Sequence, residues 1–214
     1  MDLYLSPQMF AAARAEDLVL LDAAAGEYML LPGVGTDVVA AADSNRLSGA
    51  STALAVALGE LGALSRHPAP VGRRPIPPPP TFDLGQDAGP PASSRDLRHW
   101  LLSGGDMLRG YWRRPFGALA AAERAAPDVA SDPGQVAAAA RVFRRLLPWV
   151  PFQGECLFRS LMLRAYLRRC GLSATWVVGC QTWPFEAHCW LQVGPLVLDD
   201  TADHAAGFTP LLAL

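Results

Sequence analysis

The stretch Gln153-Gly-Glu-Cys-Leu-Phe-Arg-Ser160 begins the part of the chain that decides its fold. A helical pattern runs from Cys156 to Cys170, and Gly171 is a typical residue for ending such a helix. Short apolar runs of the kind that forms strands follow it, and the last two are joined by a Gly-Pro turn. The pattern predicts a helix followed by an antiparallel sheet, with strands at 175–178, 188–193 and 196–198.

Reactive side chains stand at the borders of these predicted elements. Cys156 falls in the first turn of its helix, where free N–H groups and the helix dipole favour a thiolate. His188 lies in the second strand, and Asp199 and Asp200 end the third. Taken singly, each is more simply a buried thiol, a core imidazole or a surface acid. Together they favour a thiol nucleophile with a base and an orienting acid, and antiparallel pairing does not choose between the two acids.

The remaining polar candidates of this stretch are weaker. Gln153 is a tentative oxyanion donor, and the alternative is a solvated loop residue. Cys170, Cys180 and Cys189 are interpreted as inert, buried thiols. Because the cysteines form no Cys-x-x-Cys knuckle, we expect no metal site, and nothing in the sequence calls for a cofactor.

The length of the chain allows two small domains, and the order of the predicted elements, helices followed by an antiparallel sheet, is an α+β layout. We expect a domain over 1–66, a proline-rich linker over 67–94 that holds nine of the nineteen prolines, and a domain over 95–214. The linker is interpreted as a spacer, with a ligand for proline-binding domains as the alternative. No apolar run reaches the roughly 18 residues of a membrane span, and no signal peptide is evident. Four cysteines without paired spacing indicate a reducing, cytoplasmic location.

Charge is spread unevenly along the chain. Residues 1–64 carry two Arg and eight acids, a net charge of −6, whereas 95–170 carry thirteen Arg and six acids, a net charge of +7. The simple interpretation is solvated helix faces, and the alternative is that the Arg-rich part meets an acidic partner. The domain is not strongly basic overall, so we expect no nucleic-acid role.

The N-terminal region predicts three strands followed by three short helices. The runs Asp17–Asp22 and Glu27–Leu31 form a hairpin pattern. Thr36 is a typical N-cap residue for a helix at 37–42, and either Ser51 or Thr52 can cap a second helix that ends at Gly62. This is the layout of a small winged-helix-like module. After the linker the pattern is helical over 96–108, 109–124 and 133–147, where Asp132-Pro133 begins the last helix.

The C-terminal region resembles the B2 part of lasso peptide biosynthesis B proteins, a papain/transglutaminase-like cysteine protease. The resemblance is carried by Cys-Leu-x-Arg-Ser-Leu from Cys156, by Pro-Phe-x-Ala-His-x-Trp-Leu around His188, and by the Val-Leu-x-Asp that ends at Asp200. It covers roughly 95–214. It implies that Cys156 is the nucleophile, His188 the base and Asp200 the acid.

The N-terminal region resembles, more loosely, the PqqD-like B1 part, which recognises the precursor. The resemblance implies that the leader of a ribosomally made lasso precursor adds a strand near Glu27–Leu31. We expect Tyr28 and Leu30 on the receiving strand and Leu54 and Leu58 on the facing helix; the alternative is that these four residues are domain core. B2 then removes the leader, and an ATP-dependent, asparagine-synthetase-like cyclase closes the ring. Two alternatives stay open, a transglutaminase-like acyl transferase or amidase and a non-catalytic precursor-binding protein.

Overall fold

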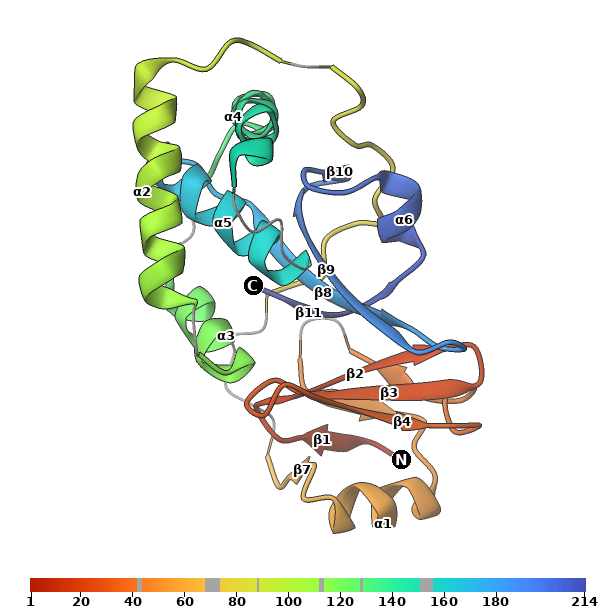
Figure 1. Cartoon of the computed structure of the whole chain (residues 1–214). Coiled ribbons are helices and arrows are strands. Elements are labelled where there is room, and N and C mark those ends of the chain that lie inside the picture. The colour runs from red at the N-terminus through yellow and green to blue at the C-terminus, as the bar shows by residue number, and fades with distance from the viewer. Residues whose placement is uncertain (42–43, 68–73, 88, 112–113, 128, 151–155) are drawn as a thin grey trace.

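The chain folds into two parts that share a packed interface (Figure 1). The N-terminal part is made of two small sheets and one helix, and the C-terminal part is a sheet with the longer helices on one face and the short helix α6 on the other. This mixture confirms the α+β class. The computed structural model describes residues 1–41, 44–67, 74–87, 89–111, 114–127, 129–150 and 156–214.

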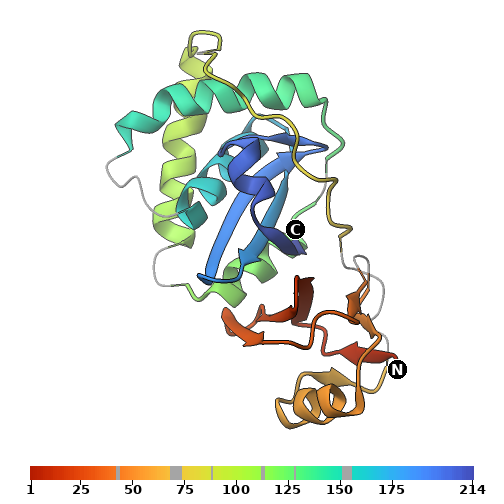
Figure 2. The same ribbon diagram turned by 90° about the vertical axis from the view of Figure 1, so that its right-hand side faces the viewer.

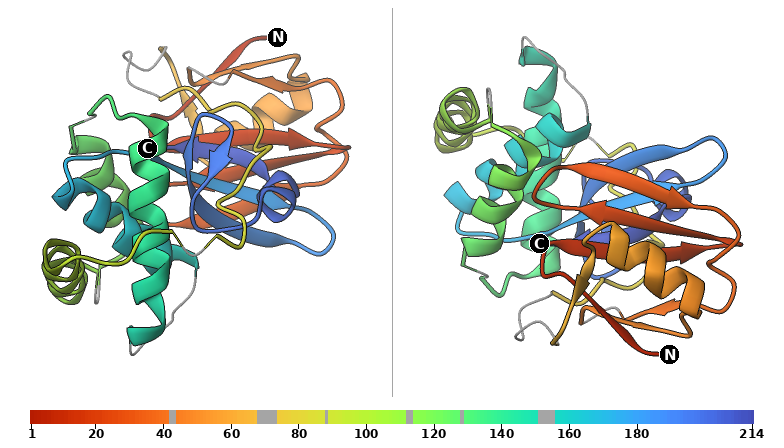
Figure 3. Two further views of the ribbon diagram at one scale, coloured as in Figure 1. Left: turned by 90° about the horizontal axis from the view of Figure 1, so that it is seen from above. Right: turned by 90° about the horizontal axis from the view of Figure 1, so that it is seen from below.

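Two antiparallel sheets build the N-terminal part, in the strand orders β5-β6-β1-β7 and β2-β3-β4. The helix α1 lies on the outer side of these sheets, away from the C-terminal part (Figure 3, right). The elements are β1 (Leu3–Leu5), β2 (Met9–Arg14), β3 (Asp17–Asp22), β4 (Glu27–Leu31), β5 (Val39–Ala40), β6 (Arg46–Ser48), α1 (Thr52–Glu60) and β7 (Leu64–Ser65).

The expected helix at 37–42 is wrong. Val39 and Ala40 instead form β5, which pairs with β6. The physical reason is that a single helical turn is unstable and disfavours β-branched residues, whereas pairing with a neighbouring strand satisfies the backbone hydrogen bonds and suits Val39. In the described part of 1–66, α1 is the one helix present, so the expected three short helices are also wrong. Of the two expected cap residues, Ser51 and Thr52, the cap is Ser51: the Leu54 N–H donates to Ser51 Oγ at 3.1 Å.

The C-terminal sheet has the order β10-β9-β8-β11, and α5 packs on it beside α2 and α4 (Figures 1 and 2). The predicted starts of α4 at Pro133 and of α5 at Cys156 are confirmed. The strand β11 and the helix α6 were not predicted. The elements are α2 (Ser94–Gly110), α3 (Phe116–Ala125), α4 (Pro133–Leu146), the 3₁₀ turn η1 (Leu147–Trp149), α5 (Cys156–Arg169), β8 (Thr175–Gln181), β9 (Glu186–Val193), β10 (Leu196–Val197), α6 (Ala202–Ala206) and β11 (Thr209–Ala213).

The strand β3 is buried on both faces and joins the two parts. Leu18 and Leu20 pack into the cluster under α1, whereas Val19 and Leu21 pack into the large cluster of the C-terminal part. This explains why the strand reads as an unbroken apolar run instead of alternating. Each such side chain contributes about 1.5–3 kcal/mol of burial free energy. The two parts therefore hold each other through a shared apolar core.

Residues 74–87 of the proline-rich linker contact the C-terminal part. The N–H groups of Thr81 and Phe82 donate to the carbonyl of Pro195, and Leu84 is buried. The Gln192 side chain donates to the carbonyl of Pro78 at 2.7 Å. Proline has no N–H, so the backbone donors that fix the segment along the sheet come from the non-proline residues at the end of the run, whereas Pro78 contributes only its carbonyl. It follows the edge near β10 (Figure 2).

None of the helices in the described ranges combines the length and the apolar character that a membrane span requires.

Candidate active site

Cys156 is the first residue of α5 and a free, half-buried thiol. A hydrogen bond from the Cys189 thiol, a hydrogen bond with His188 and the Cys189 N–H together lower the pKa of Cys156 to about 4, against the opposing effect of burial. Each of these groups stabilises the thiolate more than the thiol. Cys156 is therefore ionised at neutral pH. Gln153, the expected oxyanion donor, lies outside the described residues.

His188 lies on β9 with its ring almost fully buried. Its Nε2 lies 2.5 Å from Asp200 Oδ2, and its ring stacks on that of Trp190 at a centroid distance of 5.8 Å. Burial alone would lower the pKa of His188, but the hydrogen bonds to Asp200 and Cys156 outweigh it and raise this pKa to about 9. Because Nε2 is held by the acid, Nδ1 is the nitrogen left for the thiol. The two residues form a thiolate–imidazolium pair.

Asp200 follows β10 and binds two imidazole rings through one oxygen. Its Oδ2 contacts His188 Nε2 and, at 2.6 Å, His204 Nδ1, while Oδ1 accepts the N–H of Thr201 at 2.8 Å. Burial opposes ionisation, but the hydrogen bonds from His188, His204 and Thr201 hold the pKa of Asp200 far below its usual range. Asp200 is a charged acid that orients His188.

The neighbouring acid, Asp199, faces away from the imidazole. Its Oδ2 accepts the hydroxyl of Ser160 at 2.5 Å, and its Oδ1 accepts the N–H of Leu191 at 2.8 Å. Burial raises the pKa of Asp199 to about 6. These contacts connect α5 to the sheet. Asp199 therefore has structural partners, whereas Asp200 contacts the histidines.

Two residues of the site were missed from the sequence. His204 sits on α6, four residues after Asp200, and Thr201 caps that helix. The sequence does contain a signal for them: Thr201 is a typical N-cap residue, and His204 follows Asp200 by four residues, which places the two side chains close together at the start of a short helix. Cys189 was interpreted as inert, yet it hydrogen bonds to Cys156 and thereby lowers the pKa of that thiol.

The four expected leader-binding residues are divided between two apolar clusters. Tyr28 and Leu30 pack against the large cluster of the C-terminal part, whereas Leu54 and Leu58 are buried in the cluster under α1. Alternation along β4 is the physical reason, because the face that carries Tyr28 and Leu30 is the one turned away from α1. The ring of Tyr28 instead contacts that of Phe185 at 5.4 Å, and burial raises the pKa of this tyrosine.

One group of side chains in the described ranges has the donors for a metal ion. The ligand atoms of His188, Asp200 and His204 lie within 4.8 Å of one another. These atoms are already hydrogen bonded to each other, so an ion would have to displace the contact between His188 and Asp200.

The site therefore consists of a cysteine at the start of a helix, with a histidine on the sheet against which that helix packs and an aspartate that follows β10. The profile of the transglutaminase-like superfamily matches residues 101–213, more than half of the chain, and the chain belongs to this superfamily. Its members include cysteine peptidases and acyltransferases, and the fold is typically a cysteine-protease-like catalytic domain. No curated protein and no solved structure is significantly similar to the chain.

Proposed function

We propose that the chain is a leader peptidase of lasso peptide biosynthesis, which hydrolyses the bond between the leader and the core of a ribosomally made precursor. The observation that carries the proposal is the hydrogen-bonded series from the Cys156 thiol through His188 to Asp200. The proposed catalytic residues are these three. The lasso assignment rests on the sequence resemblance of the C-terminal part.

The proposed reaction proceeds through a thioester. The Cys156 thiolate attacks the scissile carbonyl carbon, and the imidazolium of His188 gives its proton to the amine as the C–N bond breaks. Water then attacks the thioester while His188 takes its proton, which releases the new carboxylate and restores the thiolate. Asp200 holds the imidazole ring of His188 in the same orientation during both steps. The free N–H groups at the start of α5, and Gln153 as a proposed donor, would stabilise the oxyanion.

The proposed recognition element is the N-terminal part, over 1–66, as in PqqD-like modules, with 67–94 as the connection to a catalytic domain over 95–214. Within the described residues β4 is an edge strand of its sheet, so one row of its backbone groups is open to an added strand. Tyr28 on β4 contacts Phe185, which immediately precedes the strand that carries His188. A leader paired with β4 would therefore run close to the thiol.

The proposed setting is the cytoplasm, where free thiols persist; the four cysteines are all unpaired. The freed core would pass to an ATP-dependent, asparagine-synthetase-like cyclase. The precursor leader and this cyclase are the proposed partners.

The test is incubation of the full chain and of Cys156→Ala with a precursor, followed by mass measurement of the products. We expect the unmodified chain to give leader and core whose summed mass exceeds the precursor by one water. Cys156→Ala should bind the precursor with unchanged affinity and leave it intact. Cleavage by Cys156→Ala at the original rate would overturn the proposal.

Acyl transfer is the second candidate, because the superfamily includes acyltransferases and the same thioester serves them. Added primary amine separates the two functions. A transferase attaches the amine to the acyl part at millimolar amine, whereas a hydrolase releases the free acid. A non-catalytic binding protein would differ from both, since its Cys156 would not react rapidly with iodoacetamide at neutral pH.

A further inference from the structure

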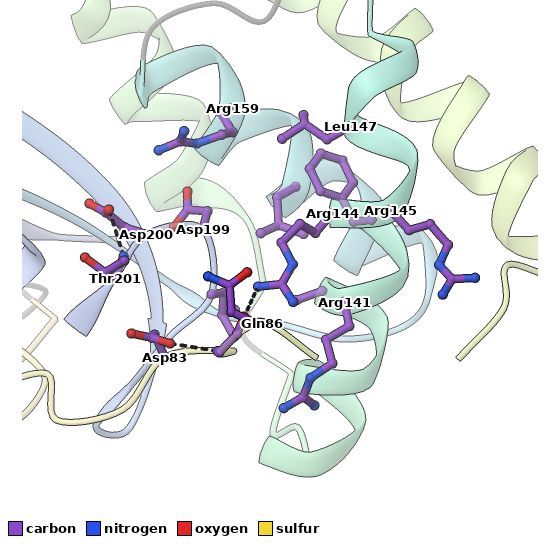
Figure 4. A pocket seen from close by; sticks show the side chains of 15 residues that line it. Asp83, Gln86, Arg141, Arg144, Arg145, Leu147, Arg159, Asp199, Asp200 and Thr201 are labelled. Carbon is purple, nitrogen blue, oxygen red and sulfur yellow. Dashed lines mark hydrogen bonds between the residues drawn. The ribbon is translucent and has the colours of Figure 1, made fainter. Parts of the chain in front are cut away.

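A cavity of about 590 Å³ lies beside Asp200, between α4, α5 and the linker (Figure 4). Its volume falls within the range of about 300–1,000 Å³ that is usual for ligand pockets. Part of its lining is apolar, with Phe143, Leu163 and Leu198. The catalytic steps above make no use of it. Its lining includes Asp200, and Arg159 on the same wall lies one turn after Cys156, so the cavity borders the proposed catalytic residues.

Four arginines line this cavity, and three of them hold the linker. Arg144 donates to the carbonyl of Gly85 at 2.7 Å and also to that of Asp87, while Arg141 pairs with the Asp87 carboxylate. Arg145 reaches a carbonyl of the same segment. The hydrogen-bonding capacity of these guanidinium groups is therefore directed mainly toward the protein itself.

Arg159 differs from these three because, among the described residues, it has no hydrogen bond or ion pair with the linker. It lies on α5 one turn after Cys156, and its buried Nε has no hydrogen-bond partner in the part of the chain that the structure describes. The Nε of Arg141 also lacks a hydrogen bond, but it lies 3.6 Å from the Asp87 carboxylate. In Figure 4 its side chain extends from α5 over the side of the cavity where Asp199 and Asp200 lie. A guanidinium has five donors in a planar fork that matches a carboxylate.

The acids of the cavity do not satisfy Arg159. The oxygens of Asp200 accept from His188, His204 and Thr201, and those of Asp199 accept from Ser160 and Leu191. The third acid, Asp83, accepts from the backbone of Gly85 and Ala202. Each carboxylate therefore has partners of its own within the protein. Arg159 acts on Asp199 through its charge alone, by lowering the pKa of that acid.

We propose that this cavity is a substrate subsite in which Arg159 binds the carboxylate of an Asp or Glu side chain near the scissile bond. The inference rests on the proposed peptidase function and names a feature of its substrate. The apolar lining would cover the side-chain methylenes and neighbouring residues, and the fork of Arg159 would take both oxygens. A planar monoanion fits better than a phosphate, whose second charge would meet three acids on the same wall.

The test uses the full chain with Cys156→Ser, which prevents turnover, and two pentapeptides that are acetylated and amidated. One has glutamate at its centre and the other glutamine, with alanine elsewhere. The Nε–Hε signals of ¹⁵N-arginine-labelled protein report binding, and the signal missing from Arg159→Gln identifies Arg159. We expect the glutamate peptide to shift this signal and to bind about tenfold more tightly than the glutamine peptide.

Arg159→Gln should remove the preference, and Arg98→Gln is the matched control, since Arg98 is exposed on α2 outside the cavity. Equal affinity of the two peptides for the Arg159-containing chain would overturn the subsite, and this comparison needs no folded Arg159 variant. A preference that survives in Arg159→Gln would overturn it as well. Binding is measured apart from cleavage, so a chain that shows the preference but cuts no leader refutes the peptidase and supports the subsite.

Discussion

One carboxylate oxygen of Asp200 serves two histidine rings, and this arrangement separates the roles of two adjacent acids. We expect Asp200→Asn to lower kcat by a factor on the order of 10⁴, because the amide cannot hold the imidazolium in place. Asp199→Asn should leave kcat within a few-fold but lower the free energy of unfolding by about 1–3 kcal/mol, because the contacts with Ser160 and Leu191 are partly buried. Steady-state kinetics and denaturant titration of both variants measure the two effects.

The thiolate–imidazolium pair predicts different pH profiles for alkylation and for cleavage. The pKa of Cys156 is lowered to about 4, so the thiolate is lost only as pH falls through that value, and alkylation should stay fast above it. The pKa of His188 is raised to about 9, so its proton is lost as pH rises through that value, and cleavage should fall there while alkylation does not. The test is to measure the rates of iodoacetamide alkylation and of precursor cleavage from pH 3 to pH 10. If both rates decline together near neutral pH, Cys156 and His188 do not form a thiolate–imidazolium pair.

Sequence patterns brought Cys156 and His188 together with the pair Asp199-Asp200, because a helix start, a strand and a strand end each have a recognisable pattern, and only the family resemblance favoured Asp200 over Asp199. Sequence reasoning did not find His204, whose helix has only five residues and too little periodicity to stand out. It could not place Tyr28, because the face that a strand residue presents to another part of the chain depends on how the two parts dock.

At the scale of elements, α6 is short but positions part of the site. Its cap, Thr201, accepts the N–H of His204, whose ring binds Asp200. We expect Thr201→Ala to lower the free energy of unfolding by about 1 kcal/mol and to lower kcat as well, because a frayed α6 releases His204.

Ser93→Ala is the matched control for that change. Ser93 caps α2 through the N–H of Asp96, in an exposed part of the molecule that does not contact the catalytic residues. The same stability loss is expected there, measured by thermal unfolding, with kcat unchanged. If both variants keep full activity, α6 does not position Asp200.

The helices were predicted best where the sequence marks their ends. Asp132-Pro133 fixed the start of α4, and Gly171 marked the end of α5. The strand β5 was mistaken for a helix because two residues have no detectable period. The strand β11 was missed, since its second residue is Pro210 and its partner, β8, lies about thirty residues earlier, so only the tertiary fold defines it.

At the scale of the whole molecule, the apolar core shared by the two parts predicts that they unfold together. Leu58 is fully buried in the N-terminal cluster, whereas all six tryptophans of the chain lie at position 100 or later. We expect Leu58→Ala to cost about 2–5 kcal/mol and to lower the unfolding midpoint that tryptophan fluorescence reports.

Val56→Ala serves as the control for that variant, because Val56 is on the same helix but 56% exposed. It should leave the tryptophan midpoint almost unchanged. A Leu58→Ala chain whose tryptophan transition stays in place while its far-UV circular dichroism shows an earlier step would mean that the two parts unfold independently.

The docking of the β2-β3-β4 sheet against the C-terminal part limits how the protein can be re-engineered for new substrates. A chimaera made by cutting in the proline-rich segment would replace Val19 and Leu21 with foreign side chains, and would thereby open the core under the catalytic sheet. It would also disturb Leu84, which is buried on the other side of the cut. The edge of β4 is open to an added strand through its backbone, but its side chains from Tyr28 to Leu31 pack against the two clusters, so a new recognition sequence would have to leave those four side chains in place.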